Sequence, residues 1–220
     1  MKKFDWASFF SNILSVVLGI FITFGIQGMI DRRAEKKEVK AALELVREEL
    51  VNNKKDLQDV IGIFSLEKEA ARFISMNKQD FSQCNPDSLI FYNNVLGSEY
   101  FYTVTDDALE LLKSSSLFQK INDKNLALGI IKSYDYLNAN SQAFNTHEKY
   151  KEELYKEVNT EKTKKASLTT TGTELLKMFY SSDEAGYFLQ SVVEIADDTF
   201  LKAGLPDIEA TIEAIEARLK

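Results

Sequence analysis

The feature that most constrains this chain is a run of 25 residues without a charged side chain, from Trp6 to Ile30. As an α-helix this run would span about 37 Å at roughly 1.5 Å per residue, which is enough to cross a bilayer with some tilt. A cleaved signal peptide would have a shorter apolar region and a small-residue cleavage site. Here the segment "GMIDRRAEKKEVK" reads as continuing helix. The sequence therefore predicts a retained transmembrane helix with a short N-terminal tail over residues 1–31.

Basic residues on the two sides of this run predict its orientation. Lys2 and Lys3 precede it, and five basic residues follow it: Arg32, Arg33, Lys36, Lys37 and Lys40. The more basic flank of a transmembrane helix usually stays in the cytoplasm. We therefore expect an N-terminus outside and a soluble domain in the cytoplasm.

Small and polar residues recur along one side of the same run. At about 100° per residue, an arc of roughly 160° holds Ser8, Ser11, Asn12, Ser15, Gly19, Thr23 and Gln27. Ile22 and Ile26 project to that side as well and could close a pore by dewetting. Two interpretations stay open, because small and polar residues in lipid mark either packing between helices of an oligomer or the lining of a narrow pore.

A heptad pattern follows the charged flank and predicts a long helical region over residues 32–80. The seam positions step alternately by four and three residues, and Asn53 is their one polar member: Val39, Leu43, Val46, Leu50, Asn53 and Leu57, continued by Val60 and Phe64. Such spacing is typical of a coiled-coil seam, so these residues are predicted to join copies of the chain. Asn53 either fixes the register of that seam or lies exposed on a bent helix.

Residues 81–220 predict a further helical domain, because start and stop signals alternate and no segment shows period-two alternation. The expected helix starts are Pro86 with Ser88, Thr103 or Thr105 before Leu109, Asp123, Thr171 with Glu174, Ser182 and Pro206. Residues 160–174 read as a linker, and the last helix carries a short zipper of Ile208, Ile212, Ile215 and Leu219. The predicted fold class is all-α: a transmembrane helix, a long helix and a helical bundle.

Composition excludes several kinds of chemistry. The net charge is −7, which argues against a general nucleic-acid binder. His147 is the only histidine and Cys84 the only cysteine, so zinc sites and Ser-His-Asp or Cys-His catalysis lack partners. We expect no enzyme activity, no cofactor and no metal. A local basic patch for an anionic ligand could form from Lys149, Lys151, Lys156, Lys162, Lys164 and Lys165, or these lysines could belong to a solvated face balanced by neighbouring glutamates.

Two stretches resemble a group of small bacterial membrane proteins over residues 10–60 and 105–150. They are "LSVVLGIFITFG" with "DRRAEKKEVKAALELVREELVNNKKDL", and "DDALELLKSSSLFQKINDKNLALGIIKSYDYLNANS". Two positions depart from the pattern: Gly28 and Met29 stand where a tryptophan is common, and Leu117 replaces a glycine. The architecture is similar to membrane effectors of bacterial anti-phage systems, in particular the channel-forming effector of the Hailong system.

The resemblance implies a homo-oligomeric channel, such as a tetramer, in the bacterial inner membrane. It also implies two kinds of partner besides the lipid bilayer: a nucleotidyltransferase-like protein, or the nucleotide or oligonucleotide that such a protein makes. We therefore expect an ion-conducting anti-phage effector that is regulated through its helical domain. The alternative is a membrane-anchored scaffold or sensor that recruits a protein partner without conduction. A tethered periplasmic domain would follow only if the orientation were reversed.

Overall fold

The computed structural model describes the backbone of residues 6–170, 172–195 and 198–220, and the side chains of these residues except 6–32 and 162. Within them every regular element is helical, which confirms the predicted all-α class. The helices are α1 (Trp6–Asn77), α2 (Pro86–Gly97), α3 (Asp107–Ser114), the 3-10 turn η1 (Phe118–Lys120), α4 (Lys124–Val158), α5 (Glu161–Ala166), α6 (Gly172–Tyr180), α7 (Asp183–Ile195), α8 (Thr199–Ala203) and α9 (Leu205–Leu219).

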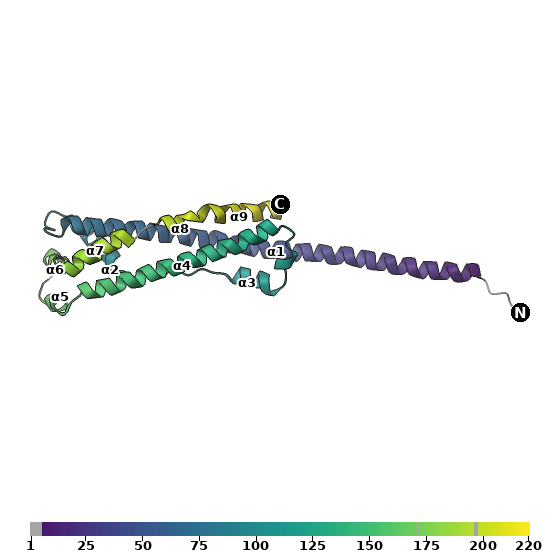
Figure 1. Cartoon of the computed structure of the whole chain (residues 1–220), viewed down its shortest axis with the longest axis horizontal. Helices are drawn as coiled ribbons and strands as arrows, with labels where there is room; N and C mark the ends of the chain where they lie inside the picture. The colour runs from purple at the N-terminus through teal and green to yellow at the C-terminus, as the bar shows by residue number, and fades with distance from the viewer. Residues whose placement is uncertain (1–5, 171, 196–197) are drawn as a thin grey trace.

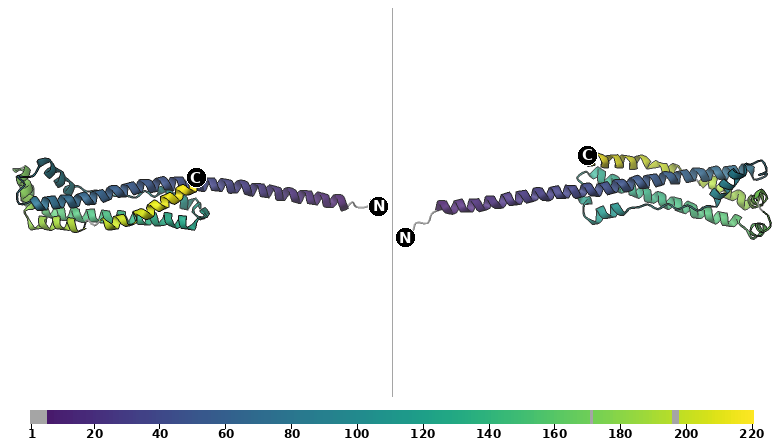
Figure 2. Two further views of the ribbon diagram at one scale, coloured as in Figure 1. Left: turned by 90° about the horizontal axis from the view of Figure 1, so that it is seen from above. Right: turned by 180° about the vertical axis from the view of Figure 1, so that it is seen from behind.

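Helix α1 organises the whole molecule. It runs for 72 residues without a break, and both prolines of the chain lie beyond it, so nothing in α1 removes a backbone donor. Its N-terminal part projects as an arm, whereas its C-terminal part lies in an elongated body beside α4 and the α7–α9 segment (Figures 1 and 2). In the text below, "arm" denotes residues 6–34 and "body" denotes residues 35–220.

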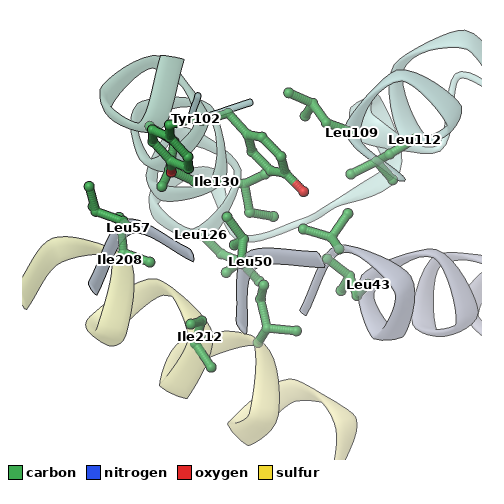
Figure 3. Close-up of a cluster of buried hydrophobic side chains, with 14 of the residues drawn as sticks. Leu43, Leu50, Leu57, Tyr102, Leu109, Leu112, Leu126, Ile130, Ile208 and Ile212 are labelled. Atoms are coloured by element: carbon green, nitrogen blue, oxygen red, sulfur yellow. The ribbon is translucent and has the colours of Figure 1, made fainter. Parts of the chain in front are cut away.

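The first hydrophobic core of the body, next to the arm, contains the heptad residues of α1. Leu43, Leu50 and Leu57 are at most 2% exposed, and they lie against Ile130 of α4 and Ile208 of α9 (Figure 3). The residues predicted as an oligomer seam instead pack inside one chain. Leu43, Val46, Leu50, Asn53 and Leu57 are buried there, and Val39 is partly buried against the same core. The same correction applies to the α9 zipper, whose isoleucines face this core because α9 returns along α1.

The second core lies at the end of the body far from the arm. Ala70, Ala71 and Ile74 of α1 meet side chains of α2, the end of α4 and α7, including Leu96, Leu154 and Phe188. Both cores combine α1 with later helices. The predicted boundary between residues 32–80 and 81–220 therefore does not separate two packing units.

Several helix starts follow the signals in the sequence. The Asp123 carboxylate accepts hydrogen bonds from the backbone N–H groups of Asn125 and Leu126, and the Ser182 hydroxyl accepts one from Ala185. Helix α2 begins at Pro86 as predicted, and the Asn85 side chain caps it. Asp106, not a threonine, is the N-cap residue of α3.

Two segments differ from the sequence prediction, and one predicted cap is not described. The predicted linker contains the short helix α5, which Thr160 caps through the backbone N–H of Thr163. Between Ser182 and Pro206, where the sequence predicts a single helix start, the chain forms two helices, α7 and α8. The predicted Thr171 cap lies outside the described residues.

The predicted membrane crossing needs correction. Where the structure describes the chain, no helical segment combines the length and the apolar character that a bilayer crossing requires. This finding contradicts the predicted localisation as a single-pass inner-membrane protein with a cytoplasmic domain. From Arg33 onward, charged side chains recur along α1 and an apolar face packs into the body. The side chains of residues 6–32, on which the prediction was based, lie outside the described residues.

Candidate functional site

A cluster of four ionisable side chains lies inside the body between the two hydrophobic cores. Glu67 comes from α1, and His147, Glu148 and Lys151 come from adjacent turns of α4. All four are nearly inaccessible, with exposed fractions of 0%, 6%, 1% and 2%. Charged groups are rarely buried unless they are paired, so this ionic cluster is the most unusual side-chain arrangement in the described interior.

The cluster is held together by hydrogen bonds to both carboxylate oxygens of Glu67 and to one carboxylate oxygen of Glu148. The Lys151 ammonium donates to Glu67 Oε1 and to Glu148 Oε2, the second at 2.7 Å. On the other side, His147 Nε2 lies 3.0 Å from Glu67 Oε2 and 3.7 Å from Glu148 Oε1. The backbone N–H of Tyr100 adds a hydrogen bond of 2.9 Å to Glu148 Oε2. Both carboxylates therefore bind the Lys151 ammonium, and Glu67 is the one of the two that lies within hydrogen-bond distance of the imidazole.

Surrounding groups shift the pKa values of the two carboxyls in opposite directions. Burial alone would raise the pKa of Glu67, but the hydrogen bond from His147 and the charge of Lys151 outweigh it and hold that pKa below its ordinary value. Burial and the nearby Glu67 charge raise the pKa of Glu148, and the interactions with Lys151 and Tyr100 offset them only in part. Glu67 is thus the carboxylate that stays ionised, and Glu148 is the one that takes up a proton first.

Three members of the cluster could also bind a metal ion. Ligand atoms of Glu67, His147 and Glu148 lie within 4.8 Å of one another. Glu148 Oε1 and His147 Nδ1 have no hydrogen-bond partner among the described residues. Lys151 already supplies a positive charge to both carboxylates. A metal-bound histidine normally donates a hydrogen bond from its second ring N–H to a partner, and His147 Nδ1 has none among the described residues. The arrangement therefore fits a structural ion-pair network better than a metal centre.

An extended segment between α2 and α3, residues 98–106, is fastened between α1 and α4 by side chains. The Asn145 amide of α4 accepts from the N–H of Tyr102 at 3.0 Å and donates to its carbonyl at 2.8 Å. Asn53 of α1 binds Thr105 in the same two-way manner, at 3.0 and 2.7 Å. With the Glu148 bond to Tyr100, the backbone is held at residues 100, 102 and 105. We call this segment the strap.

The residues predicted as a basic patch do not form one continuous surface. Lys151 is buried in the ionic cluster, Lys156 pairs with Glu152, and Lys164 lies 3.5 Å from Glu161. Lys149 and Lys165 are exposed. The side chain of Lys162 lies outside the described residues, as do those of all pore-lining candidates: Ser8, Ser11, Asn12, Ser15, Gly19, Ile22, Thr23, Ile26 and Gln27.

The ionic cluster was missed because each of its residues reads as ordinary when considered alone. A signal was nevertheless present in the heptad spacing. The steps of four and three that end at Phe64 continue to Glu67, Ala71 and Ile74, so Glu67 occupies a seam position. On α4 the buried positions Phe144, His147, Lys151 and Leu154 repeat the same spacing. Charged residues at core positions of two facing seams predict a buried pair.

Comparison with protein-family models, with curated proteins and with solved structures gave no match. The likeness to anti-phage membrane effectors therefore remains a prediction.

Proposed function

We propose that the protein is a non-catalytic helical scaffold that associates with itself through the arm and presents the body as a rigid module. The observation that carries this proposal is the continuity of α1: one helix forms the arm and also supplies the seam of both cores in the body. The arm extends away from the body (Figure 2). A partner that binds the arm is therefore connected to the body by continuous helix, without a flexible linker.

The sequence of the arm supports self-association. Residues 6–30 carry no charge, and a long uncharged helix that does not fold back onto its own chain has to cover its apolar surface elsewhere. By sequence periodicity, small residues that include Ser15 and Gly19 recur along one side of this helix, and small residues allow helices to approach closely. A second copy of the arm offers the same face, which satisfies the self-complementarity that a symmetric oligomer requires.

A catalytic role finds less support. The ionic cluster is closed to substrate, since its most exposed member, His147, is only 6% accessible. The prediction of an ion-conducting anti-phage effector stays untested. It also depends on a bilayer crossing, so conduction is not part of the proposal.

Mass-resolved light scattering on the full chain tests the proposal. We expect a trimer or larger species at micromolar concentration. Gly19→Leu should lower the mass, because the leucine side chain separates helices that meet at the small face. Phe21→Leu, on the opposite side of the helix by sequence periodicity, is the matched control and should leave the mass unchanged. A monomeric wild type would overturn the proposal.

A further inference from the structure

A groove lies where α1 enters the body. It has a volume of about 830 Å³ and is formed by three segments: α1 around Lys36 and Lys40, the turn from Gln119 to Asn122, and the end of α9 at Ala217 and Arg218. These segments are far apart in the sequence, so the groove exists only in the folded body. Its volume is in the range of small-molecule sites, which is about 300–1,000 Å³.

The charge of the groove is opposite to that of the chain. Four cationic side chains line it, Lys36, Lys40, Lys120 and Arg218, with Glu35 as the one acidic residue in the lining. The chain as a whole carries a net charge of −7. Glu35 lies 3.7 Å from Lys120. Within the described part of the chain, no carboxylate forms an ion pair with the remaining three cations, so their charge is available to an anion.

The groove also has an apolar floor. Val39 and Leu43 of α1 and Ile121 line it, and all three belong to or pack against the first core. The four cationic side chains of the lining are exposed to solvent. A ligand that fits has one strongly anionic end and an uncharged part that lies on the floor.

We propose that this groove binds a phosphorylated small molecule. Phosphate oxygens match the planar fork of Arg218, which can bind two of them at once, and lysine ammonium groups such as those of Lys36 and Lys40 add point charges. A bound phosphate connects the base of the arm on α1 with the last turn of α9. The ligand therefore stabilises the junction between arm and body, independently of how the arm associates.

Calorimetric titration of the full chain with inorganic pyrophosphate at low ionic strength tests the anion site alone. We expect saturable binding that weakens as NaCl is raised, because the contacts are exposed to solvent. Lys40→Gln and Arg218→Gln should each weaken binding at least tenfold. Both side chains are exposed, so the variants should keep the melting temperature of the wild type. Absence of pyrophosphate binding overturns the proposal.

Matched controls separate this groove from the sequence-predicted lysine patch. Lys149→Gln and Lys165→Gln remove exposed charges elsewhere and should leave the affinity unchanged. If these variants weaken binding as much as Lys40→Gln does, the site is not the groove. A further titration with vesicles that contain anionic phospholipid distinguishes the source of the phosphate. Binding of vesicles without binding of pyrophosphate also contradicts the proposal.

Discussion

The side-chain amide of Asn53 on α1 forms two hydrogen bonds with the backbone of Thr105, donating to its carbonyl at 2.7 Å and accepting from its N–H at 3.0 Å. Asn53 is 1% exposed, so neither of the roles expected from the sequence applies to it. It does not join copies of the chain, and it does not lie in solvent. The Asn53 amide satisfies the backbone N–H and carbonyl of Thr105, which in an extended segment would otherwise need the backbone of a neighbouring strand.

Replacing Asn53 distinguishes the strap from a coiled-coil seam. Asn53→Leu should lower the free energy of unfolding by about 1–3 kcal/mol, because the N–H and carbonyl of Thr105 lose their partners. In a coiled-coil oligomer the same change would raise stability. Urea denaturation at two protein concentrations measures both effects, and a gain in stability would contradict the role that we assign to Asn53.

Removal of the buried lysine should be strongly destabilising. Lys151→Met leaves the carboxylates of Glu67 and Glu148 buried without their cation, and breaking such a pair costs about 3–5 kcal/mol. Chemical denaturation measures the loss. Lys156→Met serves as the control: Lys156 pairs with Glu152 at the surface, so its loss should leave the unfolding free energy nearly unchanged.

The opposite pKa shifts of Glu67 and Glu148 predict that their contributions to the free energy of unfolding change with pH in opposite directions. Glu67 has its pKa lowered from 4.5, so its contribution to stability is present above that value and is lost as the pH falls toward the folded-state pKa. Glu148 has its pKa raised, so its contribution is present below 4.5 and is lost as the pH rises through the folded-state pKa. Relative to wild type, Glu148→Gln should therefore gain stability as the pH rises above 4.5.

Glu67→Gln should behave in the reverse way: relative to wild type it should become less stable as the pH rises through the range below 4.5. Denaturation curves for both variants from about pH 3 to about pH 8, a range that covers carboxyl titration, measure how the free energy of unfolding of each variant changes with pH. If the two variants differ from wild type with the same pH dependence, the pKa values of Glu67 and Glu148 are not shifted in opposite directions.

Two glycines give a matched pair of substitutions. A Cβ on Gly204 would lie 2.6 Å from the ring of Tyr136, whereas a Cβ on Gly62 meets nothing within 4 Å. Gly204→Ala should cost about 1–3 kcal/mol, because the ring has to move. Gly62→Ala, in an exposed turn of α1, should stabilise the protein by about 0.5–1 kcal/mol. Thermal melts of the two variants check the difference in sign.

The sequence predicts the helices of the body well because their signals are local. Asp123 and Ser182 are correct as caps, and the heptad positions of α1 from Leu43 to Phe64 are buried. Periodicity shows which face of a helix is covered but not which helix covers it. An amphipathic seam fits a second copy of the chain as well as α4 and α9. The intramolecular partner therefore had to come from the three-dimensional arrangement.

The strap and the ionic cluster were harder to predict for a different reason. The contacts between elements that define them join residues 43 to 84 positions apart, such as Tyr102 with Asn145 and Glu67 with Lys151. No single-sequence pattern links such distant residues. The clue in each case is a polar residue at a core position of a heptad, which indicates a buried partner without identifying it.

Because α1 is one unbroken helix, a rotation of α1 at the groove would move the whole arm as a rigid rod. Residues 6–34 extend for about 43 Å at roughly 1.5 Å per residue. A tilt of about 5° at the junction would displace the tip by about 4 Å on that length. A small change in the angle between α1 and the end of α9 at the groove would thus move the far end of the arm farther than the groove itself.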